Sequence, residues 1–316
     1  MNKLTALLGG TTAILAGPAM AADIVIGVPN WPSVTVTAKI LETVIEQNLG
    51  YDVELQNGTN SIVFEAMDSG SMQIHPEVWM PNQQNLVDKF VNEKGTVVMS
   101  EKSAGAFQGM CVDKATSEKY GVTSIDDLTL PEVAELIDRD GDGKGDLWIG
   151  VTGWQSTNVE KIRAKSYGYD QTMELMESDD TIAYAEMDNL VKQGKPWIGF
   201  CYGPHYAFAL QDLVSLEEPK HDPAKWNVAQ PDEDPNWLEN SEAAVAWPPL
   251  SIHVAWAKAL EEDYPGVANM LSNVQLTTDQ LSEMTYAQVI EKQDADEYAQ
   301  QWIKDHEDEV LSWFTQ

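Results

Sequence analysis

Five aromatic side chains stand at or just after stretches that the sequence pattern predicts to be β-strands, or beside prolines in loops. They are Trp31, Trp79, Trp154, Tyr202 and Trp247. The face of an aromatic ring attracts cations, and several rings around one cavity bind a quaternary ammonium group, each contact contributing roughly 0.5–2 kcal/mol when dry. Other tryptophans fall inside apolar patterns and are assigned to the core: Trp148, Trp197, Trp256, Trp302 and Trp313.

The stretch around Trp154 could also bind the opposite charge. A predicted strand at 147–151 leads through a short turn to Trp154, to the polar residues 155–157 and then to a predicted helix at 158–167. The first turn of a helix has free backbone N–H groups that attract anions. This turn could therefore bind the anionic end of a small zwitterion while the indole touches its cationic end.

An acidic loop precedes this turn and contains Asp138, Asp140, Asp142 and Asp146. Its D-x-D-x-D-G-x-x-D spacing is typical of an oxygen-only calcium loop, with Gly143 at the sharp turn. The twelfth position is Ile149, however, where such a loop needs a bidentate glutamate. A polar loop that only turns the chain is the preferred interpretation, and a structural calcium ion is the alternative. No other cofactor is expected.

The elements that must position these residues alternate along the chain. Strands are predicted at 23–28, 51–55, from Ile74, and at 107–112, 147–151, 195–202 and 250–256. Helical patterns occupy 36–48, 61–69, 82–92, 131–137, 158–167, 188–193 and the stretch after 256, while 217–240 is predicted to be a surface loop. This order predicts two α/β halves with doubly wound parallel sheets and ligands at the carboxyl ends of the strands.

Composition excludes some partners. The 316 residues are 43% hydrophobic, and 51 acidic residues against 19 basic ones give a net charge of −32. Such a chain repels nucleic acid and anionic lipid, so neither is an expected partner. The acidity is spread along the chain, which is typical of a solvated surface.

The first residues predict export. Lys3 precedes an apolar run at 4–15, and Ala19–Ala21 has the small-x-small pattern of a cleavage site. We therefore expect a signal peptide at 1–21, cleaved near Ala21, and a soluble periplasmic protein. In that oxidising compartment Cys111 and Cys201 could form a disulfide or remain two buried thiols, and the sequence leaves this open.

Motifs for catalysis are missing. The sequence contains no G-x-S-x-G, no H-E-x-x-H, no Walker loop and no G-x-G-x-x-G after its first strand. We therefore do not expect an enzyme. An exported hydrolase, with catalytic residues from distant loops, remains as a remote alternative.

Taken together, five short runs resemble the glycine betaine/choline substrate-binding proteins of ABC importers. They are 29–31, 78–81, 138–146 followed by 153–154, 194–196, and 202–205. The resemblance covers essentially the whole mature chain. It implies a type II periplasmic binding protein with two α/β lobes joined by a hinge. Lobe I would comprise 22–106 plus 246–316, and lobe II would comprise 107–245.

The resemblance also implies a site. Trp79 and Trp154 match box tryptophans of the family, Trp31 matches one in some members, and Tyr202 stands where tryptophan is usual. The backbone N–H groups of Gln155 and Ser156 match the positions that bind the ligand carboxylate, whereas Gln83 replaces a histidine of one branch. The predicted ligand-binding residues are Trp31, Trp79, Trp154, Gln155, Ser156, Tyr202, His205 and Trp247.

The implied function is that of an extracytoplasmic, monomeric receptor that delivers a small zwitterion to an ABC permease in the inner membrane. Glycine betaine is the first choice of ligand. Choline, proline betaine, dimethylsulfoniopropionate, proline and taurine are the alternatives. A sulfonium group is included because it, too, is a weakly hydrated cation.

Overall fold

The computed structural model describes residues 22–315, so the predicted signal peptide at 1–21 lies outside the described residues. The first part of the chain alternates strands and helices, as its sequence pattern predicts. Its elements are β1 (Ile24–Val28), α1 (Pro32–Leu49), β2 (Val53–Asn57), α2 (Asn60–Ser69), β3 (Ile74–Met80), α3 (Gln84–Val87), a π-helical turn (Asp88–Glu93) and β4 (Val97–Met99).

The middle of the chain forms a second α/β group. Its elements are β5 (Ala104–Asp113), α4 (Lys114–Tyr120), a 3-10 helix (Ile125–Thr129), α5 (Pro131–Ile137), β6 (Gly145–Gly150), α6 (Gln155–Tyr167), a 3-10 helix (Tyr169–Gln171), β7 (Met173–Glu177), α7 (Asp180–Lys192), β8 (Ile198–Gly203), α8 (Ala207–Leu210) and β9 (Leu213–Ser215). The sequence analysis missed β7 and placed the start of α7 eight residues too late, at Asp188.

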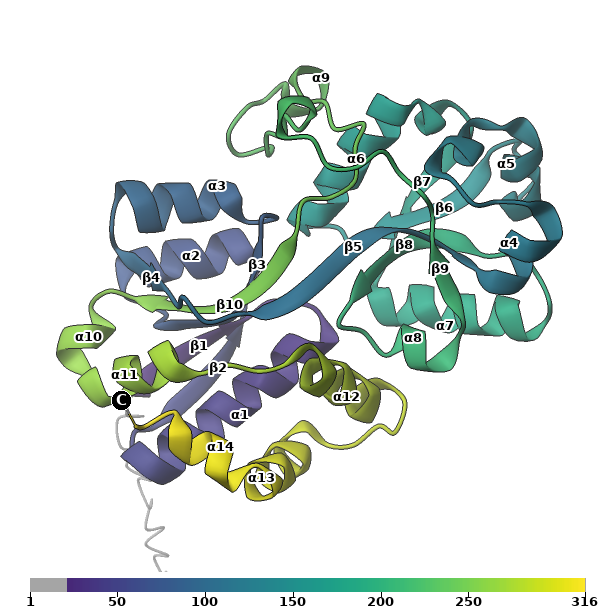
Figure 1. The fold of residues 1–316 in the computed structure, drawn as a ribbon. Helices are drawn as coiled ribbons and strands as arrows, with labels where there is room; N and C mark the ends of the chain where they lie inside the picture. The colour runs from purple at the N-terminus through teal and green to yellow at the C-terminus, as the bar shows by residue number, and fades with distance from the viewer. Residues whose placement is uncertain (1–21, 316) are drawn as a thin grey trace, which may run out of the picture.

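The last part returns to the first. Its elements are a 3-10 helix (Pro223–Lys225), α9 (Trp237–Asn240), β10 (Leu250–Ala257), α10 (Leu260–Asp263), α11 (Pro265–Asn273), α12 (Thr278–Val289), α13 (Ala295–Asp305) and α14 (Glu307–Ser312). The helices α12 and α13 pack against α1 from the start of the chain, as Figure 1 shows. No helix within residues 22–315 has the length and apolar character needed to cross a membrane.

The strands lie in the order β2-β1-β3-β10-β5-β8-β6-β7, with β4 paired to β10 and β9 to β5. The outer strands on each side are parallel, as predicted: β1 pairs with β2 and β3, and β6 pairs with β7 and β8. The two central strands differ from the prediction, because β10 and β5 run antiparallel to their neighbours. The sheet is therefore mixed.

Strand β5 connects the two groups of elements. Its residues Ala104–Ala106 pair with β10, whereas Phe107–Val112 pair with β8. In Figure 1, β5 and β10 run between the group around β1–β3 and the group around β6–β8. The lobe boundary between residues 106 and 107 stays a prediction.

Two helices begin earlier than their sequence patterns indicate. Helix α1 starts at Pro32 and not at Val36, since proline is well suited to the first helical position. Helix α6 starts at Gln155 and not at Asn158. The second difference matters for the site, because it places Gln155 and Ser156 in the first turn of the helix.

A disulfide joins Cys111 of β5 to Cys201 of β8. The two strands are neighbours in the sheet, and the two Cα atoms are 5.7 Å apart, within the range that a disulfide spans. The sequence alone could not decide this pairing, because it gives no distance between two strands that are ninety positions apart.

Candidate functional site

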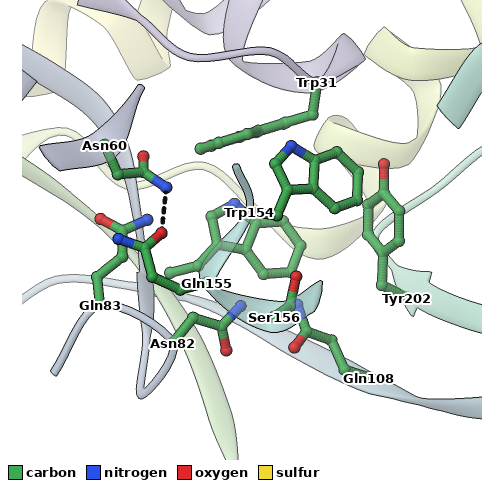
Figure 2. Close-up of a pocket in the computed structure, with 10 residues that line it drawn as sticks. Trp31, Asn60, Asn82, Gln83, Gln108, Trp154, Gln155, Ser156 and Tyr202 are labelled. Carbon is green, nitrogen blue, oxygen red and sulfur yellow. Dashed lines mark hydrogen bonds between the residues drawn. The ribbon is translucent and has the colours of Figure 1, made fainter. Parts of the chain in front are cut away.

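Four aromatic rings form a closed box where the two groups of elements meet. The ring centroids of neighbouring members are 6.4 Å apart for Trp31 and Trp79, 5.8 Å for Trp79 and Tyr202, 5.6 Å for Tyr202 and Trp154, and 6.4 Å for Trp154 and Trp31. Each of these pairs is nearly perpendicular, with interplanar angles between 80° and 90°. The four rings therefore form the walls of a box, three of which, Trp31, Trp154 and Tyr202, are labelled in Figure 2.

All four rings come from the carboxyl ends of strands. Trp79 and Tyr202 lie near the ends of β3 and β8, while Trp31 follows β1 and Trp154 follows β6. The structure thus brings together the four residues that the sequence pattern singled out at this edge. Trp31, Trp79 and Tyr202 are buried, and Trp154 is half-buried.

Amide and hydroxyl side chains complete the lining of the pocket. Beside the rings it is lined by Asn60, Asn82, Gln83, Gln108, Gln155 and Ser156. None of the described residues in this lining carries a charge. Sequence reasoning missed Asn60, Asn82 and Gln108 as site residues, although Asn60 and Asn82 both follow predicted strands closely and could have been found by that signal.

Three of these amides have unsatisfied oxygens. Asn82 Oδ1, Gln83 Oε1 and Gln108 Oε1 are buried and have no hydrogen-bond partner among the described residues. Buried polar atoms in native proteins are rarely left without a partner, so these three oxygens can accept a hydrogen bond from a bound molecule or from water. The polar half of the pocket therefore offers groups that a bound molecule can satisfy.

The first turn of α6 also faces the pocket. Gly150 and Gly153 have φ of 130° and 94°, which lets the chain turn sharply from β6 into the helix, and a Cβ at Gly150 would collide with the hydroxyl of Thr157. Trp154 occupies the capping position and supplies no side-chain hydrogen bond to the helix. The N-terminal N–H groups of α6 therefore lack a side-chain cap.

A buried carboxylate holds the Trp31 wall in place. Glu77 Oε2 accepts hydrogen bonds from Trp31 Nε1 at 2.6 Å and from Ser33 Oγ at 2.7 Å, and its Oε1 accepts one from Thr37 Oγ1 at 2.7 Å. Burial raises the pKa of Glu77, and these donors oppose the rise by stabilising the charged form. The indole of Trp31 is thus fixed by a charge-assisted bond.

A chain of hydrogen bonds connects the two groups of elements beside the pocket. The backbone N–H of Glu77 donates to His75 Nδ1 at 3.3 Å, so the proton of the neutral ring is assigned to Nε2. His75 Nε2 then donates to Asn60 Oδ1, 3.0 Å away. Asn60 Nδ2 in turn donates to Gln155 Oε1 at 2.8 Å. Burial lowers the pKa of His75 to about 3, so the imidazole is neutral at physiological pH.

His205 was predicted to contact ligand, but the structure places it behind the pocket wall. Its Nε2 lies 3.3 Å from Asp180 Oδ2, which also accepts a hydrogen bond from the Tyr202 hydroxyl at 2.5 Å. The prediction placed His205 on the correct loop. It could not say which way the ring turns, because that depends on the packing of α7 against β8.

Trp247 also lies outside the pocket lining. Its ring packs with Val159 and Leu250, and its Nε1 donates to Glu160 Oε1 at 2.7 Å. Glu160 in turn lies 3.1 Å from the buried Arg163 Nε. Trp247 therefore belongs to a packed cluster that holds the segment before β10 onto α6. The other tryptophans assigned to the core are indeed buried: Trp148, Trp197, Trp256, Trp302 and Trp313.

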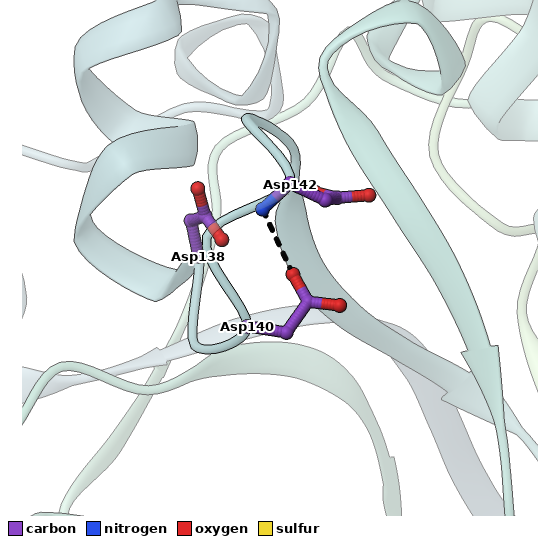
Figure 3. Close-up of side chains that lie close together, drawn as sticks. All are labelled: Asp138, Asp140 and Asp142. Atoms are coloured by element: carbon purple, nitrogen blue, oxygen red, sulfur yellow. Dashed lines mark hydrogen bonds between the residues drawn. The ribbon is translucent and has the colours of Figure 1, made fainter.

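The acidic loop lies away from the pocket, before β6. Carboxylate oxygens of Asp138, Asp140 and Asp142 lie within 4.8 Å of one another (Figure 3). Each already accepts backbone N–H groups of the loop: Asp138 from Gly141 and Gly143, Asp140 from Asp142, and Asp142 from Lys144. Asp146 accepts from the backbone of Arg139 and lies 3.5 Å from its guanidinium group.

Residues 22–305 match the family model described as the substrate-binding domain of ABC-type glycine betaine transport systems. The chain belongs to this family. Its members are transport proteins and not enzymes, and the predicted family is thereby confirmed.

Curated relatives of this substrate-binding domain are similar over most of their length. The glycine betaine/proline betaine-binding periplasmic protein of Salmonella typhimurium is 25% identical over 284 residues, which cover 84% of this chain and 82% of the relative. The protein of the same name from Escherichia coli is 22% identical over 291 residues, covering 88% and 86%.

Solved structures share the fold of this substrate-binding domain. A choline-binding protein of an ABC transporter in complex with choline superposes with a TM-score of 0.72 at 16% identity, covering 92% of this chain and 90% of the other. A lactococcal binding protein closed around glycine betaine gives 0.69 at 20% identity, covering 92% and 99%. The predicted type II periplasmic binding-protein fold is confirmed.

Proposed function

We propose that this substrate-binding domain binds a quaternary ammonium or sulfonium zwitterion, with glycine betaine as the first choice. The observation that carries the proposal is the box of four aromatic rings, each nearly perpendicular to its two neighbours. A trimethylammonium group is bulky, weakly hydrated and positive, so it gains from several π faces at once and loses little hydration on entering. An anion or a neutral polar solute would gain nothing from these walls.

The polar half of the pocket supports a zwitterion. The uncapped N-terminus of α6, at Gln155 and Ser156, attracts a carboxylate through its N–H groups and the helix dipole. The side-chain NH2 groups of Asn82, Gln83 and Gln108 can donate further hydrogen bonds to that carboxylate without adding net charge. A ligand with no net charge suits a lining without charged side chains, which favours betaines over choline.

The site is divided between two bodies, and this supports binding by closure. Trp31 and Trp79 come from the β1–β3 group, whereas Trp154 and Tyr202 come from the β6–β8 group. Ligand would bind first to Trp31 and Trp79, and rotation about the segment near residues 106–107 would bring the other two walls and α6 over it. A ligand that touches both groups stabilises the closed state in preference to the open one.

The remaining parts of the proposal follow from the family. The relatives named above are periplasmic, and a disulfide is stable in such a compartment. We therefore place the mature chain in the periplasm, as a monomer that delivers its ligand unchanged to an ABC permease. The proposal includes no cofactor: the acidic loop, whose carboxylates accept its own backbone N–H groups, is interpreted as a polar turn, with a structural calcium ion as the alternative.

The experiment is calorimetric titration of the purified mature protein with a panel of ligands. The panel consists of glycine betaine, proline betaine, choline, dimethylsulfoniopropionate, proline and taurine, together with glycine derivatives carrying fewer N-methyl groups. We expect affinity to fall steeply as methyl groups are removed. Indifference to methylation, with tight taurine binding, would overturn the proposal, and release of a product from any ligand would show an enzyme instead.

A further inference from the structure

One wall of the box is backed by a buried carboxylate. The hydroxyl of Tyr202 donates to Asp180 Oδ2 at 2.5 Å, and both side chains are buried, at 4% and 3% exposure. Tyr202 is the one member of the box that is not tryptophan, and tyrosine is the weaker π donor of the two. The partner behind its hydroxyl therefore bears on how well this wall attracts a cation.

The charge of Asp180 is not neutralised by a cation. In the described part of the chain the only side chain that forms an ion pair with it is His205, whose Nε2 is 3.3 Å away. His205 Nδ1 accepts from the backbone N–H of Ala207, so Nε2 carries the proton and donates it to Asp180. Burial lowers the pKa of His205, which keeps the ring neutral. Asp180 is also the first residue of α7, where the helix dipole stabilises a negative charge.

A carboxylate at this place acts on the ring through the hydroxyl. Burial and the charge of Asp180 raise the pKa of Tyr202 well above its usual value, so the phenol keeps its proton. The charge-assisted hydrogen bond draws that proton toward Asp180 and leaves more electron density on the oxygen and the ring. The face that Tyr202 turns toward the box then carries a more negative potential, to which the charge of Asp180 adds directly across the dry interior.

We propose that Asp180 is a specificity-determining residue, whose carboxylate strengthens the attraction between the Tyr202 ring and the cationic head of the ligand. The inference rests on the proposed function, because it concerns the charge of the ligand that the box takes. It assigns Asp180 a role without ligand contact. Asp180 would favour a cationic head over an uncharged one of the same shape.

The test compares two ligands of the same shape in calorimetric titrations. Glycine betaine carries a positive nitrogen, and 3,3-dimethylbutanoate has a carbon atom in its place. For Asp180→Asn we expect betaine affinity to fall by roughly fivefold. This loss corresponds to part of the binding free energy of one cation–π contact. Affinity for 3,3-dimethylbutanoate should stay the same or rise. This ligand has no cationic head to lose attraction, and the substitution removes only the repulsion between its carboxylate and that of Asp180. Tyr202→Phe, which keeps the ring but removes the hydroxyl, should show the same selective loss.

Asp179→Asn is the matched control. It removes the same charge from the neighbouring residue, whose carboxylate bonds to Thr181 and not to Tyr202, and it should leave both affinities unchanged. If Asp180→Asn weakened both ligands equally, Asp180 would be only structural and the inference would be wrong. An unchanged betaine affinity in both Asp180→Asn and Tyr202→Phe would also overturn it. If the wild-type protein bound no betaine at all, the proposed function itself would fail.

Discussion

The indole N–H of Trp154 donates a hydrogen bond to the main-chain carbonyl of Asn30, 3.0 Å away. Asn30 immediately precedes Trp31, so the bond ties one wall of the box to the backbone that carries another. Trp154 follows β6 and Asn30 follows β1, and the bond therefore spans the two groups of elements. The four rings therefore form the box in an arrangement in which the two groups are in direct contact.

Replacing a wall of the box should remove binding without unfolding the protein. We expect Trp79→Ala and Trp154→Ala each to weaken glycine betaine binding by roughly tenfold or more, because each removes a cation–π contact and opens the box to water. Calorimetry measures the affinity, and near-ultraviolet circular dichroism verifies the fold.

Trp313 provides the control for these variants. It is buried at 2% exposure and stacks with Trp302 in the C-terminal helices, far along the chain from the box. Trp313→Ala should cost about 3–5 kcal/mol of stability yet leave the affinity of the folded protein nearly unchanged. Trp313→Phe is the milder variant if the alanine form does not fold. Equal losses of affinity at all three positions would point to general destabilisation.

Glu77 should make ligand affinity depend on pH. Burial raises the pKa of this carboxyl, so on acidification it takes up a proton at a higher pH than a solvated glutamate does. Neutral Glu77 no longer fixes Trp31 by a charge-assisted bond, and affinity for glycine betaine should therefore fall as pH is lowered through that pKa. Titrations over a series of pH values measure the effect.

The variant Glu77→Gln isolates this contribution. Its affinity at neutral pH should already be low, and its fall on acidification should be smaller than in the wild type. The free energy of unfolding should depend on pH in the opposite direction to ligand affinity. A raised carboxyl pKa means that the fold favours the neutral form of Glu77, so its contribution to the free energy of unfolding grows as pH falls. Parallel pH profiles of affinity in the two proteins would contradict the prediction.

His75 should make the fold sensitive to acid. Its pKa is lowered from 6.5 to about 3 by burial, so between these values the unfolded chain binds a proton that the folded protein excludes. The free energy of unfolding should therefore decrease as pH falls from about 6.5 toward 3. Urea unfolding at a series of pH values measures this slope. In His75→Gln the slope should be smaller, and an identical slope would exclude His75 as its source.

The disulfide should support stability more than binding. It closes a loop of ninety positions, and loss of such a bridge typically costs about 2–4 kcal/mol. The double variant Cys111→Ser/Cys201→Ser should unfold at a lower temperature than the wild type and should not respond to reductant. Its ligand affinity at moderate temperature should be nearly unchanged. A wild type that shows no response to reductant under unfolding conditions would speak against the bridge.

The aromatic walls could be predicted from the sequence because their signal is local. Trp31, Trp79, Trp154 and Tyr202 each stand at a strand end, and the carboxyl ends of parallel strands gather at one edge whatever the details of packing. The sequence pattern predicts the start of helix α6 at residue 158, three residues after its actual start at Gln155. Residues 155–157 are polar, so the helical spacing of apolar residues does not extend over the first turn.

The remaining features depend on tertiary contacts. The antiparallel direction of β10 and β5 is set by their partners in the sheet, and their own residues carry no sign of it. His205 and Trp247 lie on the expected segments, but their side chains are directed by Asp180 and Glu160, which are distant in sequence. Gln108 could not be predicted as a site residue for a related reason. In the sequence pattern, a glutamine that lines a pocket cannot be distinguished from one on the exposed face of a strand.

Gln108 lies two residues beyond Ala106, the last residue of β5 that pairs with β10. Any rotation of one half of the molecule against the other changes the backbone torsion angles of this short crossing. If residues 106–107 form the hinge, as proposed, the side chain of Gln108 would reorient with the backbone, and its contact with the solute would depend on the opening angle. A molecule bound to Gln108 would then restrict rotation at the proposed hinge, and release of the solute would free it.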